Sequence, residues 1–282
     1  MRDLQKIVII IVIALAAYAS YPLICEQSSP TPELPKEVSE GYLGFAEITV
    51  LVDNNPEEYL KSPWGVSIYV KTQDLSILFD AGPDPQALKE NSEKLGVDLK
   101  TLDLAVISHE HGDHVRGLSY VAEVNENLTV YVPEHMSTSC KKWIRGLGLN
   151  VVEIESTTMI SRGIAVIGEL YGPPFEQALA INVKDLGLII LVGCSHPGVD
   201  NLVAKAAVDL KSKPYAVIGG FHLSGASLDR IRSASEKLVE AGLKKIYPIH
   251  CSGEKIRSFL EENYPEVYGG GRVGLKLIFR VD

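Results

Sequence analysis

Three of the seven histidines in this 282-residue chain lie within six residues of one another. They are His109, His111 and His114, and an aspartate, Asp113, directly precedes the last of them. Side chains two residues apart on an extended segment point to the same side, so His109 and His111 can bind one metal ion together. Gly112 allows a sharp turn, after which Asp113 and His114 can bind a second ion. Four side chains cannot complete two such sites, so further ligands must come from elsewhere in the chain.

Imidazole nitrogens and carboxylate oxygens are suitable ligands for Zn²⁺, iron and Mn²⁺. A catalytic zinc ion keeps three protein ligands and leaves one position for water. The ion lowers the pKa of this water toward neutrality, which makes a metal-bound hydroxide available as a nucleophile. Two ions about 3.5–4 Å apart can also bind the attacking and leaving oxygens of an ester or a phosphate. The residue types therefore indicate metal-assisted hydrolysis.

Three further histidines, His196, His222 and His250, each follow a short apolar run that is typical of a strand. Strand ends can meet at one rim of a sheet, so these side chains can join the cluster. We expect His196 and His250 to be metal ligands. His222 is either a ligand or a hydrogen-bond donor to the charge that develops on the substrate. His135 lacks this strand-end setting and is expected at the surface.

The elements that must position these side chains follow from the apolar patterns. Strands are expected at 45–52, 66–70, 75–79, 104–107, 128–132, 151–154, 164–167, 179–183, 188–192, 215–218, 245–247 and 273–279. Helices are expected at 84–95, 199–210, 227–241 and 253–262. Both halves place strands first and helices later, which favours two packed sheets with helices outside over a doubly wound parallel sheet. We expect a single α/β domain over residues 42–282.

Composition limits the function classes. The chain is 46% hydrophobic and 22% charged, as in soluble globular proteins, which excludes a disordered or collagen-like chain. The net charge of −9 argues against a dedicated nucleic-acid binder, because such proteins bind phosphates mainly through Lys and Arg. Four cysteines without a CxxC pair exclude a disulfide scaffold and a zinc ribbon. We therefore expect a small-molecule substrate and no nucleic-acid partner.

The first 41 residues differ from the rest. Arg2 and Lys6 precede an uncharged run at 7–25, close to the roughly 20 residues that cross a bilayer as a helix. The apolar part at 7–18 has the length of a signal-peptide core. We expect a hydrophobic helix in residues 1–25, as a signal peptide or membrane anchor that places the domain outside, with a buried element as the alternative. Residues 26–41 are expected to form a proline-rich linker. The protein is thus expected to be membrane-anchored or secreted.

The motifs resemble a known superfamily. His109-x-His111-x-Asp113-His114 after a strand resembles the signature of the metallo-β-lactamase superfamily. Asp80, two residues before Gly82, resembles the upstream motif of that superfamily. The aspartate of that motif does not bind metal but orients the metal ligands by hydrogen bonding. Other motifs resemble the group named after dihydropterin ribofuranosyl-aminobenzene phosphate synthase of methanopterin biosynthesis. These are Asp53-Asn54, Asn91, Gly193 to Gly198 with Asn201, Gly219 to Leu223, His250 to Gly253 and Gly269 to Gly274.

The resemblance covers about residues 48–279 and implies a four-layer αββα sandwich. It implies two divalent metal ions, zinc first, with iron or manganese as alternatives. One ion is expected at His109, His111 and His196, and the other at Asp113, His114 and His250. Asp80 is expected to orient a ligand, and Asp113 and His222 to act in catalysis. The expected activity is hydrolysis of an ester or phosphate ester by a metal-bound hydroxide.

One departure from the superfamily pattern leaves the bridging group open. The superfamily usually has an aspartate in a Gly-Asp pair that bridges the two metals, whereas this chain has Gly193-Cys194. Water or hydroxide, Cys194 or His222 can fill that role.

Two other functions also stay open. One is a transferase resembling the named synthase, although an outward leader argues against a pathway inside cells. The other is a non-catalytic, membrane-tethered protein that binds metal or ligand.

Overall fold

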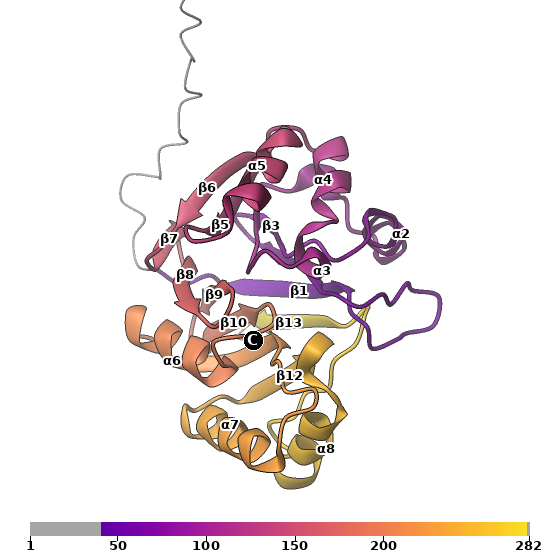
Figure 1. Cartoon of the computed structure of the whole chain (residues 1–282). Helices are drawn as coiled ribbons and strands as arrows, with labels where there is room; N and C mark the ends of the chain where they lie inside the picture. The colour runs from indigo at the N-terminus through magenta and orange to yellow at the C-terminus, as the bar shows by residue number, and fades with distance from the viewer. Residues whose placement is uncertain (1–40, 281–282) are drawn as a thin grey trace, which may run out of the picture. The chain divides into compact units, whose positions relative to one another are not determined.

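The computed structural model describes residues 41–280, which form two β-sheets and the helices packed on them (Figure 1). The expected leader helix and nearly all of the linker lie outside the described residues. Among residues 41–280, no helix combines the length and the apolarity that crossing a membrane would require.

The first sheet has seven strands in the order β13-β1-β2-β3-β4-β5-β6. Their bounds are Lys276–Arg280 (β13), Phe45–Val52 (β1), Ser67–Thr72 (β2), Ser76–Phe79 (β3), Leu104–Val106 (β4), Thr129–Pro133 (β5) and Asn150–Ile154 (β6). The strands from β13 to β3 pair antiparallel, whereas those from β3 to β6 pair parallel. Parallel neighbours need crossover connections, and helices supply them here.

The second sheet has six strands in the order β12-β11-β10-β9-β8-β7. Their bounds are Lys245–Ile249 (β12), Pro214–Gly220 (β11), Gly187–Val192 (β10), Phe175–Val183 (β9), Ile164–Tyr171 (β8) and Thr158–Ser161 (β7). The strands β10, β11 and β12 are parallel, and β7 to β10 are antiparallel. Each sheet therefore has a parallel part whose strands end on the same side.

Helices cover the outer face of each sheet (Figure 1). The first sheet carries α2 (Pro85–Leu95), α4 (Leu118–Val124) and α5 (Thr138–Gly146), with the short α3 (Gly112–Val115) at its rim. The second carries α6 (Val199–Asp209), α7 (Leu228–Glu240) and α8 (Glu254–Asn263). Two 3₁₀ turns, η1 (Leu99–Thr101) and η2 (His250–Ser252), complete the elements.

Three apolar clusters hold these layers together. The central cluster lies between the sheets and includes the fully buried Ile48, Phe79, Leu179 and Ile218. The other two lie between each sheet and its helices. Burying a side chain of this size stabilises the fold by about 1.5–3 kcal/mol. The layer order is α-β-β-α, which confirms the expected four-layer sandwich.

The structure also contains elements that the apolar pattern did not predict: α3, α4, α5 and β7. The α5 segment has 9 residues and buries only Ile144, so it offers few apolar positions from which a helical period can be recognised. The α4 segment contains two valines, which favour strands more than helices. The expected order of strands before helices is therefore wrong: helices alternate with strands from β3 to β6, and again from β10 to β13.

Candidate metal centre

The predicted ligands come from the carboxyl ends of four parallel strands in the two sheets. His109 to His114 follow β4, His196 follows β10, His222 follows β11 and His250 follows β12. Three residues at these ends, Ser195, His222 and His250, have φ of 61°, 50° and 50°. A positive φ is uncommon for residues other than glycine and costs about 1–3 kcal/mol where nothing compensates. At these turns the backbone changes direction directly after a strand, where the histidine side chains enter the site.

Six of the seven histidines come together at this rim. The ring centroids of His109 and His114 are 4.1 Å apart, and those of His114 and His250 are 5.2 Å apart. His111 lies 4.7 Å from His109 and 4.9 Å from His196, measured in the same way. The ring of His222 lies 4.5 Å from that of His196.

The seventh histidine, His135, lies outside this cluster. It is half exposed, stacks on Phe175 with a centroid distance of 4.6 Å, and hydrogen-bonds to Glu169. The expectation of a surface histidine is therefore met.

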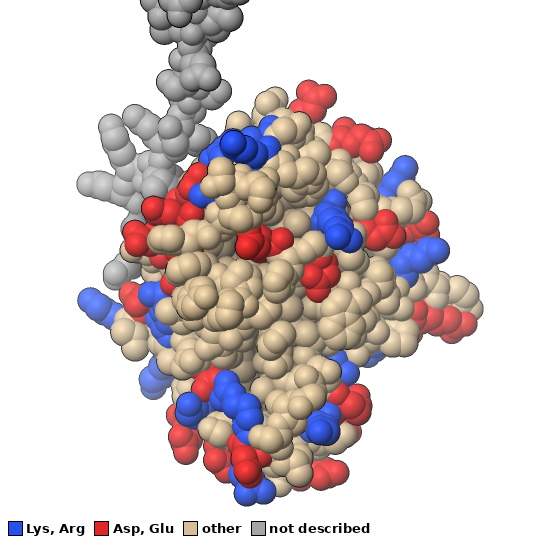
Figure 2. Space-filling model, viewed as in Figure 1, with Lys and Arg blue, Asp and Glu red and all other residues tan. Residues whose placement is uncertain are grey.

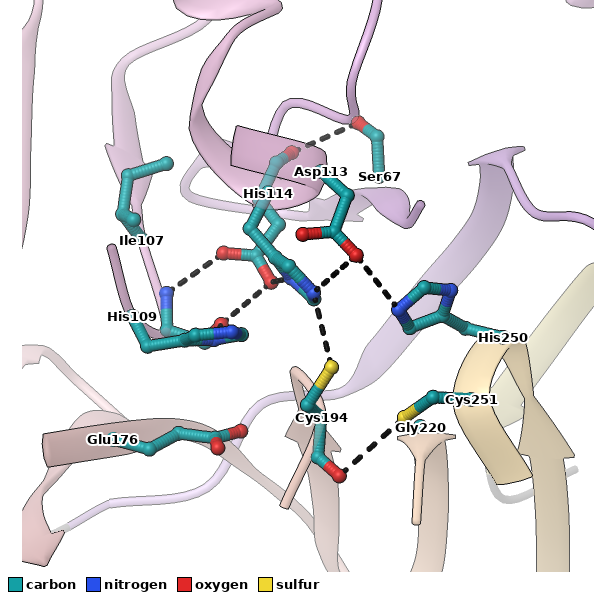
Figure 3. A network of polar contacts seen from close by, with 12 residues as sticks. Ser67, Ile107, His109, Asp113, His114, Glu176, Cys194, Gly220, His250 and Cys251 are labelled. Carbon is teal, nitrogen blue, oxygen red and sulfur yellow. Dashed lines mark hydrogen bonds and ion pairs between the residues drawn. The ribbon is translucent and has the colours of Figure 1, made fainter. Parts of the chain in front are cut away.

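One group of ligand atoms contains Asp113, His114, Cys194 and His250, all within 4.8 Å of one another. Asp113 Oδ2 lies 3.3 Å from His250 Nε2 and 3.8 Å from His114 Nε2. His114 Nε2 lies 3.2 Å from Cys194 Sγ. Figure 3 shows these four side chains converging, two from the segment after β4 and one each from the ends of β10 and β12. The carboxylate, two imidazoles and a thiol form a donor set for a transition-metal ion.

A second group joins His109 and His196 to the same Cys194. The exposed His111 flanks this group, with its ring beside both histidines. A third group consists of Cys194, His222 and Cys251. The structure thus groups His109 with His196 and groups Asp113 with His114 and His250, whereas His111 lies beside the first group without belonging to it.

Two buried nitrogen atoms test whether a cation fits. Among the described residues, Nε2 of His109 and Nε2 of His250 are buried without a hydrogen-bond partner. His250 Nε2 lies 3.3 Å from Asp113 Oδ2, which is an ion-pair distance, but the two atoms are not oriented for a hydrogen bond. An unpaired buried polar atom costs about 1–3 kcal/mol. A cation among these atoms would remove that cost, so the donor set fits a metal ion.

The charges of His109, His111 and Asp113 also favour a bound cation, whereas burial acts to lower the pKa of His114 but the Asp80 carboxylate raises it. Burial, and then the neighbouring imidazoles of His114 and His196, hold the pKa of His109 well below its usual value. Burial and His196 also lower the pKa of His111. Neutral imidazole is the form that binds metal. Burial acts to raise the pKa of Asp113, but His250 and His114 together bring it below its ordinary value, so this carboxylate is ionised.

Asp80 supports the ligands from behind. Its carboxylate accepts hydrogen bonds of 2.7 Å from the Ser108 backbone N–H, the Ser108 hydroxyl and His114 Nδ1. With Nδ1 of His114 held by Asp80, Nε2 of that ring faces the centre. The Ser108 hydroxyl also lies 2.9 Å from His109 Nδ1. Asp80 therefore occupies the place expected for a supporting residue.

Glu176 is a functional residue that the sequence analysis missed. It lies on β9, is fully buried, and accepts hydrogen bonds from His196 Nδ1 at 2.8 Å and from the Ser195 and His196 backbone N–H groups at 2.7 and 2.8 Å. The available signal was a glutamate inside an apolar strand. Its partners lie 19 and 20 residues further along the chain, so no local pattern connects them.

The 53–54 pair plays the same part for His250. Asn54 Oδ1 lies 3.0 Å from His250 Nδ1, and Asp53 accepts the His250 backbone N–H at 2.7 Å. All four buried or half-buried imidazoles therefore have Nδ1 on an oxygen atom, which leaves Nε2 free to face the centre.

The surroundings offer room for a substrate. A groove of about 600 Å³ beside the centre is lined by Glu110, His111, Gly112, Val115, Arg116, Ser137, Ser139, Cys140 and Trp143. Trp64, which is 55% exposed, lies against His250 with a centroid distance of 4.9 Å. On the face shown in Figure 2, the described basic and acidic side chains are interspersed rather than gathered into one basic patch.

Comparisons with known proteins agree with this geometry. Residues 76–168 match the family model described as a β-lactamase superfamily domain. The chain is 31% identical over 234 residues to the 7,8-dihydropterin-6-methyl-4-(β-D-ribofuranosyl)-aminobenzene-5′-phosphate synthase of Methanocaldococcus jannaschii, covering 67% of this chain and 80% of that protein. It is 29% identical over 254 residues to an uncharacterized protein of the same organism, covering 79% and 96%.

A solved structure gives the same result. Tm1679, described as a metal-dependent hydrolase of the β-lactamase superfamily, superposes with a TM-score of 0.71 at 25% identity, over 82% of this chain and 98% of that one. The sandwich, the strand-end histidines and the similarity to the synthase agree. The chain belongs to the metallo-β-lactamase superfamily and, within it, to the family of the dihydropterin ribofuranosyl-aminobenzene phosphate synthase.

Proposed function

We propose that the protein is a metal-dependent hydrolase that acts on an ester or phosphate ester. One observation carries the proposal: two adjoining groups of donor atoms include buried Nε2 atoms that have no hydrogen-bond partner within residues 41–280. When bound there, divalent ions supply Lewis acidity and lower the pKa of water so that hydroxide forms near neutral pH.

The side chains divide into two ligand sets. His109, His111 and His196 would hold one ion, and Asp113, His114 and His250 the other. Ser108, Asp80, Glu176 and Asn54 fix the rings through their Nδ1 atoms. We expect zinc first for this set of imidazoles and a carboxylate, with iron or manganese as alternatives.

His222 is placed to act on the substrate. It is exposed at the rim, beside the ring of His196. A hydrogen bond with Cys251 raises the pKa of His222, which favours the protonated ring. A protonated imidazole at this position can donate a hydrogen bond to an oxyanion or a leaving group. Asp113 stays ionised and can orient a water molecule as well as bind metal.

A second candidate is a transferase. The observation that favours it is the 31% identity to the M. jannaschii synthase. The ions that these donor groups would hold would then stabilise a leaving diphosphate instead of lowering the pKa of water. The two candidates are separated by the acceptor, because a transferase releases diphosphate only when the second substrate is present.

The test uses the full-length chain with zinc, iron or manganese and a panel of carboxylic and phosphate esters. We expect turnover that a chelator abolishes and that His114→Ala reduces to background. His135→Ala is the matched control and retains activity, because His135 lies outside the cluster. Retained activity in His114→Ala would overturn the proposal.

We also propose that residues 1–25 direct the domain outside the cytoplasmic membrane, as an anchor or as a cleaved signal. The support is the uncharged run at 7–25 behind Arg2 and Lys6. Fractionation of cells that express the full chain tests this. Recovery of intact chain, with its first residues, from the cytosol would contradict it.

A further inference from the structure

We infer that Cys194 supplies a thiolate shared by both metal positions, in the place where the superfamily usually has an aspartate. The inference rests on the proposed dinuclear centre and names its bridging ligand. It also assigns a chemical preference, because a thiolate selects softer cations such as Zn²⁺, Co²⁺ and Fe²⁺ over Mg²⁺ and Mn²⁺.

The first argument is position. Among the described residues, Cys194 is the one member common to all three groups of potential ligands. Its Sγ lies within 4.8 Å of the donor atoms of Asp113, His114 and His250, and equally within 4.8 Å of those of His109 and His196. His114 Nε2 is 3.2 Å from this sulfur. A ligand between two ion positions must meet this condition, and Figure 3 shows the thiol pointing into the centre.

The second argument is how the fold brings the thiol there. Cys194 follows β10. The preceding residue, Gly193, lies against Ser108 at the end of β4. A Cβ atom added at Gly193 would be 2.0 Å from Ser108 Oγ and 3.0 Å from Glu176 Oε1. Only glycine lets the end of β10 lie this close to the end of β4. Cys194 is therefore located between the ligands that follow β4 and those that follow β10 and β12. The side chain is 4% exposed and thus shielded from solvent.

The third argument is the chemistry of the alternatives. His222 is the other protein candidate for the shared position, but it belongs only to the group with Cys194 and Cys251. Cys251 Sγ donates a weak hydrogen bond to the Cys194 carbonyl oxygen at 3.6 Å. This contact fixes the backbone of Cys194, whose Sγ lies 3.2 Å from His114 Nε2 in the centre. On binding, the thiol proton leaves to solvent and the sulfur coordinates as thiolate.

The experiment measures absorption of the full-length protein loaded with Co²⁺. A thiolate bound to Co²⁺ gives an intense sulfur-to-metal charge-transfer band in the near ultraviolet, which imidazole and carboxylate ligands do not give. We expect this band in the wild type and its loss in Cys194→Ser. Cys140→Ser is the matched control, because Cys140 lies on α5 and belongs to none of the three groups, and it keeps the band. Cys251→Ser also keeps the band.

The outcomes separate this inference from the proposed function. Two bound ions without the band, or a band that disappears in Cys251→Ser and persists in Cys194→Ser, would overturn the shared thiolate and leave the dinuclear centre standing. Absence of bound ions would overturn both. Cys194→Asp keeps the inference testable if the serine variant fails to fold. It should keep both ions, lose the band and bind Mn²⁺ relatively better than the wild type.

Discussion

At the scale of single residues, the centre depends on which nitrogen of each imidazole faces inward. Ser108, Asp80, Glu176 and Asn54 each take one Nδ1 atom, so four Nε2 atoms are presented to the same space. Such outer partners typically contribute a factor of 10 to 100 in metal affinity. The imidazoles alone therefore do not define the site.

Asp80→Asn should weaken metal binding about 10- to 100-fold, because the amide holds His114 Nδ1 less strongly than the carboxylate does. Competition against a chromophoric chelator measures this change. Asp185→Asn, at an exposed turn, is the control and should bind metal like the wild type. Equal affinities for the wild type and Asp80→Asn would contradict the supporting role.

The same variant has a pH signature in the metal-free protein. Burial acts to lower the pKa of His114, but the Asp80 carboxylate raises it above the usual value. A raised pKa stabilises the fold at pH values below about 6.5, and this contribution is lost as pH rises through the folded pKa. Asp80→Asn should therefore lose more stability at pH 6 than at pH 9 in denaturant unfolding. An equal loss at both values would show that the pair carries no charge interaction.

His222→Ala should lower kcat about 100- to 1000-fold, as expected for loss of one hydrogen-bond donor to the developing charge. Metal content should stay at the wild-type value, because the two proposed ligand sets do not include His222. Steady-state kinetics and elemental analysis on the same preparation measure both quantities. A variant that loses metal would instead identify His222 as a ligand.

At the scale of elements, the turns after the strands decide the geometry. The apolar patterns predicted most strands and the helices α2, α6, α7 and α8, because β-branched runs and helical periodicity are local signals. They also predicted the strand-end histidines. They missed α4 and α5, which have only 7 and 9 residues, and Glu176, because its partners follow another strand. Long-range hydrogen bonds of this kind leave no trace in local periodicity.

Gly193→Ala tests the closest approach between two elements. Its Cβ would lie 2.0 Å from Ser108 Oγ, so the end of β10 must move away from the end of β4. Crowding of this kind costs about 1–3 kcal/mol, and the displaced thiol should reduce metal content as well. Denaturant unfolding and elemental analysis measure both. Gly146→Ala, where an added Cβ would have no other atom within 4 Å apart from its own helix backbone and chain neighbours, is the control and should lower neither quantity. Unchanged metal content in Gly193→Ala would count against the geometry.

At the scale of the whole domain, the centre joins the two sheets. His109, His111, Asp113 and His114 follow a strand of the first sheet, and His196 and His250 follow strands of the second. A ligand that binds only the folded protein stabilises it, by about 2.7 kcal/mol when its concentration is 100 times Kd. Metal binding should therefore stabilise the domain as a unit.

Removal of metal with a chelator should lower the melting temperature of the wild type, and readdition of zinc should restore it. His114→Ala should show a smaller difference, because one ligand set is incomplete. Differential scanning calorimetry with and without chelator measures this effect. An unchanged melting temperature of the wild type after chelator treatment would show that metal binding does not stabilise the domain.

The central claim is a dinuclear metal centre, and elemental analysis of the purified full-length chain tests it most directly. The wild type should contain about two equivalents of zinc, iron or manganese. His114→Ala should fall toward one equivalent, whereas His135→Ala should stay at the wild-type value. Less than about half an equivalent in a folded wild-type protein, after incubation with each of these metals, would contradict the account.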